Sequence, residues 1–176
     1  MDNVSRIQKA IRDIPDFPKP GVIFKDITPV LADAALFRDL IEFFAADIAP
    51  GECDCVAGID ARGFILGGAL ALRLGVGFVP IRKKGKLPFE CISEEYALEY
   101  GAGTLEMHRD AVRSGQRVLL IDDLLATGGS AAAAARMLRT LGAEVIGIRF
   151  LMELEFLHGR NALTGYPVRS LIQVHS

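Results

Sequence analysis

Two adjacent carboxylates and the small residues that follow them form the stretch with the clearest chemical potential. Asp122 and Asp123 come directly after an apolar run, and a row of small residues begins three positions later: Ala126, Thr127, Gly128, Gly129 and Ser130. At the start of a helix, such residues let unpaired backbone N–H groups approach an anion, and the two hydroxyls can donate as well. The row therefore predicts a binding site for a terminal phosphate.

The paired acids indicate what that phosphate is attached to. Carboxylates at the end of a strand can accept hydrogen bonds from two neighbouring hydroxyls of a sugar. A phosphate next to a diol is the arrangement found in a ribose 5-phosphate. The alternative is an ordinary strand-to-helix turn with an acidic cap, and the double acid directly upstream disfavours it.

A second loop, earlier in the chain, repeats this layout. An apolar run over residues 55–59 ends at Asp60, and Ala61 and Arg62 lead through a glycine into an apolar helix over 64–74. A guanidinium at the mouth of a helix can make paired hydrogen bonds to a phosphate, although a lone arginine could equally be a surface residue. Because the carboxyl ends of parallel strands meet at one edge of a sheet, the two loops predict one site along that edge.

The densest positive charge in the chain follows the apolar run over residues 77–81. Arg82, Lys83, Lys84 and Lys86 stand there almost in succession. A run of cations is usually a solvated turn. Beside a site for a phosphorylated sugar, we favour pyrophosphate binding by three of them, Arg82, Lys83 and Lys86.

These stretches carry a resemblance to a known family. Residues 118–130 read as an apolar strand, two acids and a small residue before Thr-Gly-Gly-Ser, and they resemble the phosphoribosyl pyrophosphate (PRPP) signature of the type I phosphoribosyltransferases. The resemblance implies that the paired acids hold the ribose hydroxyls and that the small residues hold the 5-phosphate. It also implies a pyrophosphate loop at Asp60, Ala61 and Arg62, with a cis peptide bond between the first two.

A segment near the N-terminus adds a more specific resemblance. Residues 16–29 read Asp-Phe-Pro-Lys-Pro-Gly-Val-Ile-Phe-Lys-Asp-Ile-Thr-Pro, similar to the N-terminal signature of one branch of the family, the adenine phosphoribosyltransferases. The resemblance implies a hood over the nucleobase, in which Phe24 covers one face of the base and Leu124 the other. It further implies that backbone groups of Ile23 and Lys25 meet the base edge, where N–H and C=O groups complement adenine. Taken alone, the residues favour a simpler interpretation in which Phe24 caps the core.

Residues 87–109 are expected to form a mobile flap, because they combine glycines, a proline and several carboxylates. The match to the family is partial here, since residues 88–91 place a bulky aromatic and an acid where relatives usually have smaller residues. The resemblance implies that Glu99, within this flap, is the acid nearest the base. We expect Glu99 to exchange a proton with the purine as a catalytic acid/base; the alternative is an ordinary surface carboxylate.

The resemblance as a whole implies a pentosyltransferase of purine salvage that converts adenine and PRPP into AMP and pyrophosphate. It implies Mg²⁺ bound mainly through PRPP, pyrophosphate and water, with no dedicated protein ligands, and a homodimer with the cationic run near its two-fold interface. One alternative is a transferase for 6-oxopurines, which the hood match disfavours. The other is a PRPP-sensing regulator without catalysis, and the chain shows neither an additional DNA-binding domain nor a basic surplus for that role.

The elements that would position these groups are those of a single α/β domain. The chain has 176 residues, a formal net charge of −2 and 51% hydrophobic residues, enough for one buried core. We predict a type I phosphoribosyltransferase-like fold over residues 1–176, with a central, mostly parallel sheet flanked by helices. A small N-terminal hood (residues 1–30) and the flexible flap (residues 87–109) complete the predicted fold.

Local patterns predict most of the elements. Apolar spacing predicts an amphipathic helix over residues 4–14, followed by a loop with little regular structure over 16–29. Asp33 is expected to cap the next helix. A strand, a helix and another strand are then expected over residues 118–121, 130–141 and 145–151.

The composition does not point to a nucleic-acid or membrane partner. The near-neutral charge gives no basic footprint, no apolar run approaches membrane-spanning length, and the start of the chain lacks a signal-peptide pattern. We therefore expect a cytoplasmic enzyme with small-molecule substrates. Its three cysteines are expected to be reduced thiols, and we assign no catalytic role to its three histidines.

Overall fold

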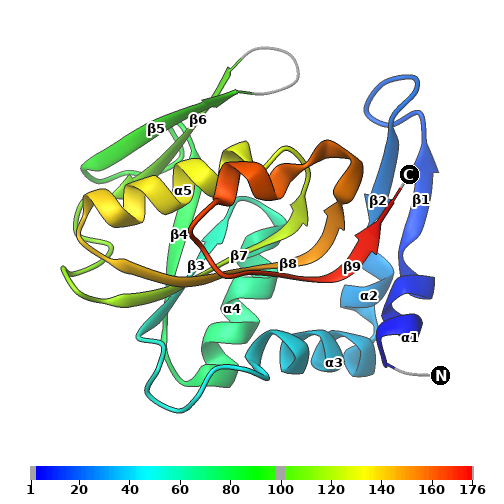
Figure 1. Ribbon diagram of the computed structural model, residues 1–176, viewed down its shortest axis with the longest axis horizontal. Coiled ribbons are helices and arrows are strands. Elements are labelled where there is room, and N and C mark those ends of the chain that lie inside the picture. Colours follow the sequence, from blue (N-terminus) through cyan, green and yellow to red (C-terminus); the bar gives the residue numbers. More distant parts are fainter. Residues whose placement is uncertain (1–2, 98–101, 176) are drawn as a thin grey trace. The chain divides into compact units, whose positions relative to one another are not determined.

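The structure of the protein is a computed structural model that describes residues 3–97 and 102–175 (Figure 1). The chain divides into two compact units, residues 1–46 and residues 47–176. The expectation that the whole chain acts as one domain stays a prediction.

The N-terminal unit combines helices with a short antiparallel sheet. Its elements are α1 (Asn3–Ala10), β1 (Arg12–Pro15), β2 (Ile23–Asp26), α2 (Thr28–Ala32) and α3 (Ala34–Ala45). Asp33 caps α3 as predicted, because its carboxylate accepts hydrogen bonds from the backbone N–H groups of Ala35 at 2.8 Å and Leu36 at 3.1 Å. This cap satisfies donors that would otherwise lack a partner at the helix start.

Two predictions for this unit are wrong in part. The predicted helix over residues 4–14 ends before β1 begins, and part of the predicted loop is β2, which pairs antiparallel with β1. Ion pairs across the two strands stabilise this hairpin, one between Arg12 and Asp26 at 2.7 Å and one between Lys25 and Asp13 at 2.7 Å. Helical periodicity does not reveal such partners, because they become neighbours only when the strands pair.

The larger unit is built on one sheet with helices on both faces. Its elements are β3 (Cys55–Ile59), α4 (Arg62–Leu74), β4 (Gly77–Lys83), β5 (Cys91–Ala97), β6 (Ala102–His108), β7 (Arg117–Leu125), α5 (Gly129–Thr140), β8 (Glu144–Leu154), the 3₁₀ turns η1 (Glu155–Leu157) and η2 (Gly159–Leu163), and β9 (Val168–Val174). Figure 1 shows α4 and α5 on opposite sides of this sheet. Within the described ranges, no helix is long and apolar enough to cross a membrane.

The sheet is mostly parallel, which confirms the predicted fold class. Its described strands run in the order β5-β6-β4-β3-β7-β8-β9. The pairs β3–β4, β3–β7, β7–β8 and β8–β9 are parallel, whereas β4–β6 and β5–β6 are antiparallel. At its centre, β3 is buried along its whole length, and residues 118–121 of β7 have no exposed surface. The apolar runs of the sequence are therefore strands covered on both faces.

The segment predicted to be a mobile flap is largely a regular β-ribbon formed by β5 and β6. Arg136 of α5 fastens the ribbon to the helix. Its guanidinium donates to Oε2 of Glu94 at 3.1 Å and to the carbonyl oxygen of Glu95 at 3.2 Å. Residues 98–101, which include Glu99, lie outside the described residues. The motion of this segment therefore stays a prediction.

Candidate active site

The structure brings the two predicted loops together at one edge of the sheet. β3 and β7 are parallel neighbours, with Gly58 opposite Ile121, so the residues that follow these strands lie side by side. α4 begins at Arg62, just after β3, and α5 begins at Gly129, just after β7. Two helix starts with their unpaired N–H groups therefore point toward the same edge.

The paired acids lie inside β7, which is longer than the strand predicted over residues 118–121. β7 extends beyond residue 121 because β8 stays paired with it as far as Leu125, which lies opposite Glu153. Asp122 is half-buried, and Asp123 is only 7% exposed. The two carboxylates are therefore held by the sheet itself, which is more rigid than a loop.

Two arginines of the site are paired with two of its aspartates. Nε of Arg62, at the start of α4, lies 2.9 Å from Oδ2 of Asp123. Nε of Arg82, near the end of β4, lies 3.2 Å from Oδ2 of Asp60, and the same guanidinium donates to the carbonyl oxygen of Lys86 at 3.1 Å. Because both guanidinium groups are partly exposed, a phosphate that reaches this edge can compete with the aspartates for them.

The remaining residues of the predicted pyrophosphate site lie around these ion pairs or beyond them. The peptide bond between Asp60 and Ala61 is cis, as the resemblance implies. Lys83 ends β4, and Lys86 follows in the turn; both side chains are exposed. The structure therefore gathers Asp60, Arg62 and Arg82 at the edge, while the lysines extend into solvent.

Gly63, the glycine after Arg62 in the predicted pyrophosphate loop, lies close to β7. A Cβ atom at this position would lie 3.0 Å from the carbonyl oxygen of Ile121 and 3.2 Å from Oδ1 of Asp122. A larger residue would push the start of α4 away from the end of β7. The glycine after Arg62 is visible in the sequence, but its contact with a distant strand is not.

Asp122 holds its proton more firmly than an ordinary aspartate. Burial raises the pKa of its carboxyl group, and the adjacent Asp123 carboxylate raises it further. The backbone N–H of Asp123, which donates to Oδ1 of Asp122 at 2.9 Å, and the charge of Arg62 oppose this shift without cancelling it. Hydroxyl donors or a cation would stabilise the carboxylate form of Asp122 and thereby favour loss of its proton.

The small residues predicted to bind a phosphate form a tight loop at the start of α5. Gly128 has a left-handed backbone with φ of 82°, a conformation that costs other residues energy. A pocket of about 70 Å³ lies against the loop, lined by Asp122, Leu124, Leu125, Ala126, Thr127, Gly128, Gly129, Ser130, Ala131 and Phe150. The predicted phosphate residues, one of the acids and Leu124 thus surround one small cavity.

The other predicted base-binding residues belong to the N-terminal unit. Ile23, Phe24 and Lys25 lie in β2, whereas Leu124 lies in β7 of the larger unit. Ile23 is 59% exposed, so β2 presents apolar surface to its surroundings. The arrangement of Phe24 and Leu124 on opposite faces of a base stays a prediction, as does the role of Glu99.

The site contains oxygen donors that suit a hard cation. Among residues 3–97 and 102–175, no three His, Cys, Asp or Glu side chains are grouped so that they could hold a metal ion by themselves. The carboxylates of Asp60, Asp122 and Asp123 nevertheless lie along the edge where the two loops meet. Mg²⁺ prefers such oxygens together with substrate phosphates and water, so the residues present fit an ion that arrives with its substrate.

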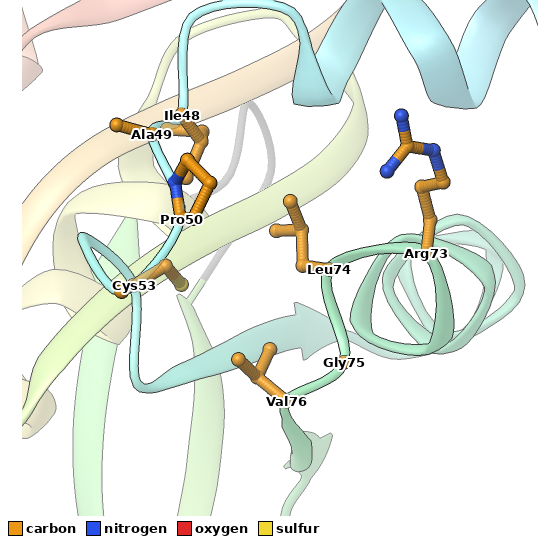
Figure 2. A pocket seen from close by; sticks show the side chains of 9 residues that line it. Ile48, Ala49, Pro50, Cys53, Arg73, Leu74, Gly75 and Val76 are labelled. Atoms are coloured by element: carbon orange, nitrogen blue, oxygen red, sulfur yellow. The ribbon is translucent and has the colours of Figure 1, made fainter.

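A second pocket, of about 320 Å³, lies near the starts of β3 and β4, and Figure 2 shows its lining. It is lined by Ile48, Ala49, Pro50, Gly51, Cys53, Arg73, Leu74, Gly75 and Val76. Burial raises the pKa of the Cys53 thiol, so this pocket does not present a reactive thiolate. None of its lining residues belongs to the predicted site, which lies at the other end of β3.

Comparison with known proteins agrees with this geometry. A family model described as the phosphoribosyl transferase domain matches residues 25–169. The adenine phosphoribosyltransferase of Caldanaerobacter subterraneus subsp. tengcongensis is 56% identical to this chain over 167 residues, which cover 95% of this chain and 96% of that protein.

Solved structures give the same result at the level of the fold. The adenine phosphoribosyltransferase of Thermoanaerobacter pseudethanolicus superposes with a TM-score of 0.94 at 54% identity, covering 97% of this chain and 99% of that one. The APRTase of Giardia lamblia, complexed with 9-deazaadenine, superposes with a TM-score of 0.93 at 36% identity, and the match covers 100% of both chains. The similarity therefore extends over both units of the chain.

Proposed function

Because the chain belongs to the adenine phosphoribosyltransferase family, we propose that its sheet-edge site transfers the 5-phosphoribosyl group from PRPP to adenine, giving AMP and pyrophosphate. The observation that carries this proposal is that two candidate anion sites meet at one acid pair. The phosphate loop before α5 lines a pocket together with Asp122, and Arg62 of the loop before α4 pairs with Asp123, while Arg82 pairs with Asp60. PRPP has the same layout, with a phosphate, a diol and a pyrophosphate on one sugar.

The reaction needs orientation and charge stabilisation more than it needs a protein nucleophile. As pyrophosphate leaves, C1 of the ribose becomes cationic, and the incoming base must already lie in line behind it. In our proposal, Arg62 and Arg82 exchange their aspartate partners for pyrophosphate oxygens, while Asp122 and Asp123 accept hydrogen bonds from the ribose hydroxyls. Mg²⁺, when bound with PRPP, supplies further positive charge against the leaving group.

Adenine is proposed to lie between Phe24 and Leu124, with the backbone of Ile23 and Lys25 at its edge. The exposed apolar surface of β2 supports this role for the hood, because an aromatic ring and backbone polar groups together complement a purine. Glu99 is proposed as the acid/base that exchanges a proton with the purine when N9 forms the new bond. Closing of the flap would remove Glu99 from water and favour its protonated form.

We also propose a homodimer. Ile65 and Leu72 of α4, which lie on one face of the helix, are 47% and 85% exposed, and a Cβ on Gly68 between them would meet no atom within 4 Å. An exposed apolar helix face with room for close approach is typical of an interface between two copies. The mass measured by light scattering at assay concentration should be twice that of the chain; a fully active monomer would remove the interface from this proposal.

A cytoplasmic location is proposed on the basis of the cysteines. Cys53, Cys55 and Cys91 are free thiols. Thiols persist in reducing compartments, where disulfides are rare.

One assay tests the proposed reaction. Release of pyrophosphate from PRPP should be measured with adenine, hypoxanthine, guanine, xanthine and orotate as acceptors. We expect adenine to be preferred by at least about a hundredfold, because a site that hydrogen-bonds one purine edge leaves polar groups unpaired with another. Preference for a 6-oxopurine would favour the related transferase, and PRPP binding without any transfer would favour a sensing role.

A further inference from the structure

The short turn η2 lies directly behind the phosphate loop. A Cβ on Gly128 would collide with the carbonyl oxygen of Gly159 and lie 3.0 Å from the Cβ of Ala162. Conversely, a Cβ on Gly159 would collide with the carbonyl oxygen of Ala126. The backbones of the loop and of η2 are therefore in contact without side chains between them. A displacement of η2 must move the loop.

An ion pair with two parallel hydrogen bonds holds η2 in place. Arg160 of η2 donates from Nε to Oε1 of Glu153 at 2.7 Å and from Nη2 to Oε2 at 2.7 Å. Its Nη1 donates to the carbonyl oxygen of Val168 at 3.1 Å. One guanidinium thus ties η2 to both β8 and β9, and a planar fork of this kind fixes direction as well as distance.

Glu153, the partner of Arg160, is buried in β8 and is therefore held in place by the sheet. Its side chain is 4% exposed, and the residue lies opposite Leu125, the last residue of β7 before the phosphate loop. Burial acts to raise the pKa of Glu153, but hydrogen bonds from Arg160 and Ser170, together with the charge of Arg160, outweigh burial and lower it. The carboxylate is therefore charged at neutral pH, and Arg160 is its charged partner.

We propose that Glu153 and Arg160 are positioning residues for PRPP, because their ion pair holds η2 against the phosphate loop and thereby sets the place of the 5-phosphate. Neither residue lines the pocket beside the loop, so their effect passes through the backbone contact of Gly128 with Gly159. This inference rests on the proposed function, since it assumes that the loop binds the 5-phosphate of PRPP.

The test uses Arg160→Gln in the full-length chain. The side chain of Arg160 is 46% exposed, so shortening it does not open the core. We expect the KM for PRPP to rise about tenfold, because small displacements of a binding loop are costly, while the KM for adenine changes by less than about twofold. Inhibition by ribose 5-phosphate should weaken in parallel with PRPP, whereas inhibition by pyrophosphate should not change. Arg160→Lys keeps the charge without the fork and should recover part of the loss.

Asp54→Asn is the matched control. Arg117 and Asp54 form the same forked contact, at 3.0 Å and 2.7 Å, but at the opposite end of β7 from the phosphate loop. Loss of this pair should lower the melting temperature without a selective effect on PRPP. The comparison separates a role in positioning from a general contribution to stability.

Three results would overturn the proposal. They are an unchanged KM for PRPP in folded Arg160→Gln, equal rises in KM for PRPP and adenine, or a selective loss of PRPP affinity in Asp54→Asn. If Arg160→Gln does not fold, Arg160→Lys carries the same test. If the unmodified chain does not transfer the sugar to adenine, the proposed function fails instead. Calorimetric titration with ribose 5-phosphate then decides whether the ion pair controls the loop.

Discussion

The loop after β3 and the loop after β7 both join a buried strand to a helix at the same sheet edge, but they offer an anion different groups. The loop after β7 offers backbone N–H groups and hydroxyls, and its shape is set by the contact between Gly128 and Gly159. The loop after β3, together with the neighbouring end of β4, offers guanidinium groups, and these are engaged by aspartates, Arg62 by Asp123 and Arg82 by Asp60. The loop after β7 would therefore bind an anion through the shape of its backbone, and the loop after β3 through positive charge.

Because of this difference, the free-energy cost of binding should differ between the two ends of PRPP. A loop with a fixed backbone requires little rearrangement when a phosphate binds, so its affinity depends on geometry. Guanidinium groups that must leave aspartates to bind pyrophosphate gain only the difference in free energy between the two ionic interactions. The pyrophosphate end should therefore respond more strongly to ionic strength than the 5-phosphate end does.

The largest effect is expected from Gly128→Ala, which attacks the shape of the phosphate loop. The added Cβ would collide with the Gly159 carbonyl, and we expect kcat/KM for PRPP to fall by at least about a hundredfold. Gly115→Ala is the control: its φ of 78° is equally left-handed, but a Cβ there meets no atom within 4 Å. It carries the backbone strain of about 1–2 kcal/mol without the collision. Normal kinetics in folded Gly128→Ala would show that the loop is not rigid.

The second effect concerns proton transfer, which neither loop supplies. Glu99→Gln keeps the size of the side chain but cannot exchange a proton in the same way. We expect kcat to fall by at least about tenfold, with a smaller change in the KM for adenine. PRPP binding should be unaffected, which would separate the chemistry from the two loops. If kcat holds and only the KM for adenine rises, Glu99 positions the base instead.

A smaller effect is expected from Arg82→Lys, which attacks the charged loop. Lysine keeps the charge but loses the fork and the contact with the Phe64 ring, whose centroid lies 5.8 Å from the guanidinium carbon. Loss of about 1 kcal/mol should raise the KM for PRPP about fivefold. Inhibition by pyrophosphate should weaken and inhibition by ribose 5-phosphate should not, the reverse of the pattern expected for Arg160→Gln. Lys84→Met, a neighbouring cation outside the predicted site, is the control; an equal effect there would indicate general charge attraction.

The smallest effect is expected from Asp122→Asn, on the free energy of unfolding. Asp122 lies in β7, where the two loops meet. The raised pKa of Asp122 means that its contribution to stability is present at low pH and is lost as pH rises through the folded-state pKa. Asparagine avoids that loss, so the variant should be more stable than the parent by about 1 kcal/mol near pH 8 and should show no advantage near pH 4. Its affinity for PRPP should fall. Thermal melts across this pH range test the sign, and lower stability near pH 8 would contradict it.

Local signals predicted most of the fold because they depend on neighbouring residues. The alternation of apolar strands and helices and the cap at Asp33 could be inferred from short stretches, whereas the cis bond after Asp60 was implied only by the family resemblance. The ends of β7 could not, because Leu125 is strand only through its pairing with β8. The hairpin of β1 and β2 was missed for the same reason, since its ion pairs join residues from two separate segments.

In the candidate site, too, features formed by contiguous residues could be predicted, and features formed by separated residues could not. The phosphate loop and the acids were recognisable because their residues are contiguous in sequence. The contacts of Gly63 with β7, of Gly159 with the phosphate loop and of Arg160 with Glu153 were not, because each joins residues that are separated in the chain. Sequence reasoning found the groups that would touch the substrate and missed those that hold them in place.

The contact between Gly128 and Gly159 also restricts how the gene for this chain can change over generations. A mutation that gives either position a side chain meets the unchanged backbone of the other, so neither glycine offers a neutral first step. Both positions can vary only after the spacing between β7 and η2 has widened, which itself displaces the phosphate loop. Gly128 and Gly159 have no reactive side chain, yet a change at either depends on the other. We therefore expect descendants of this lineage to keep both glycines or to lose the present conformation of the phosphate loop.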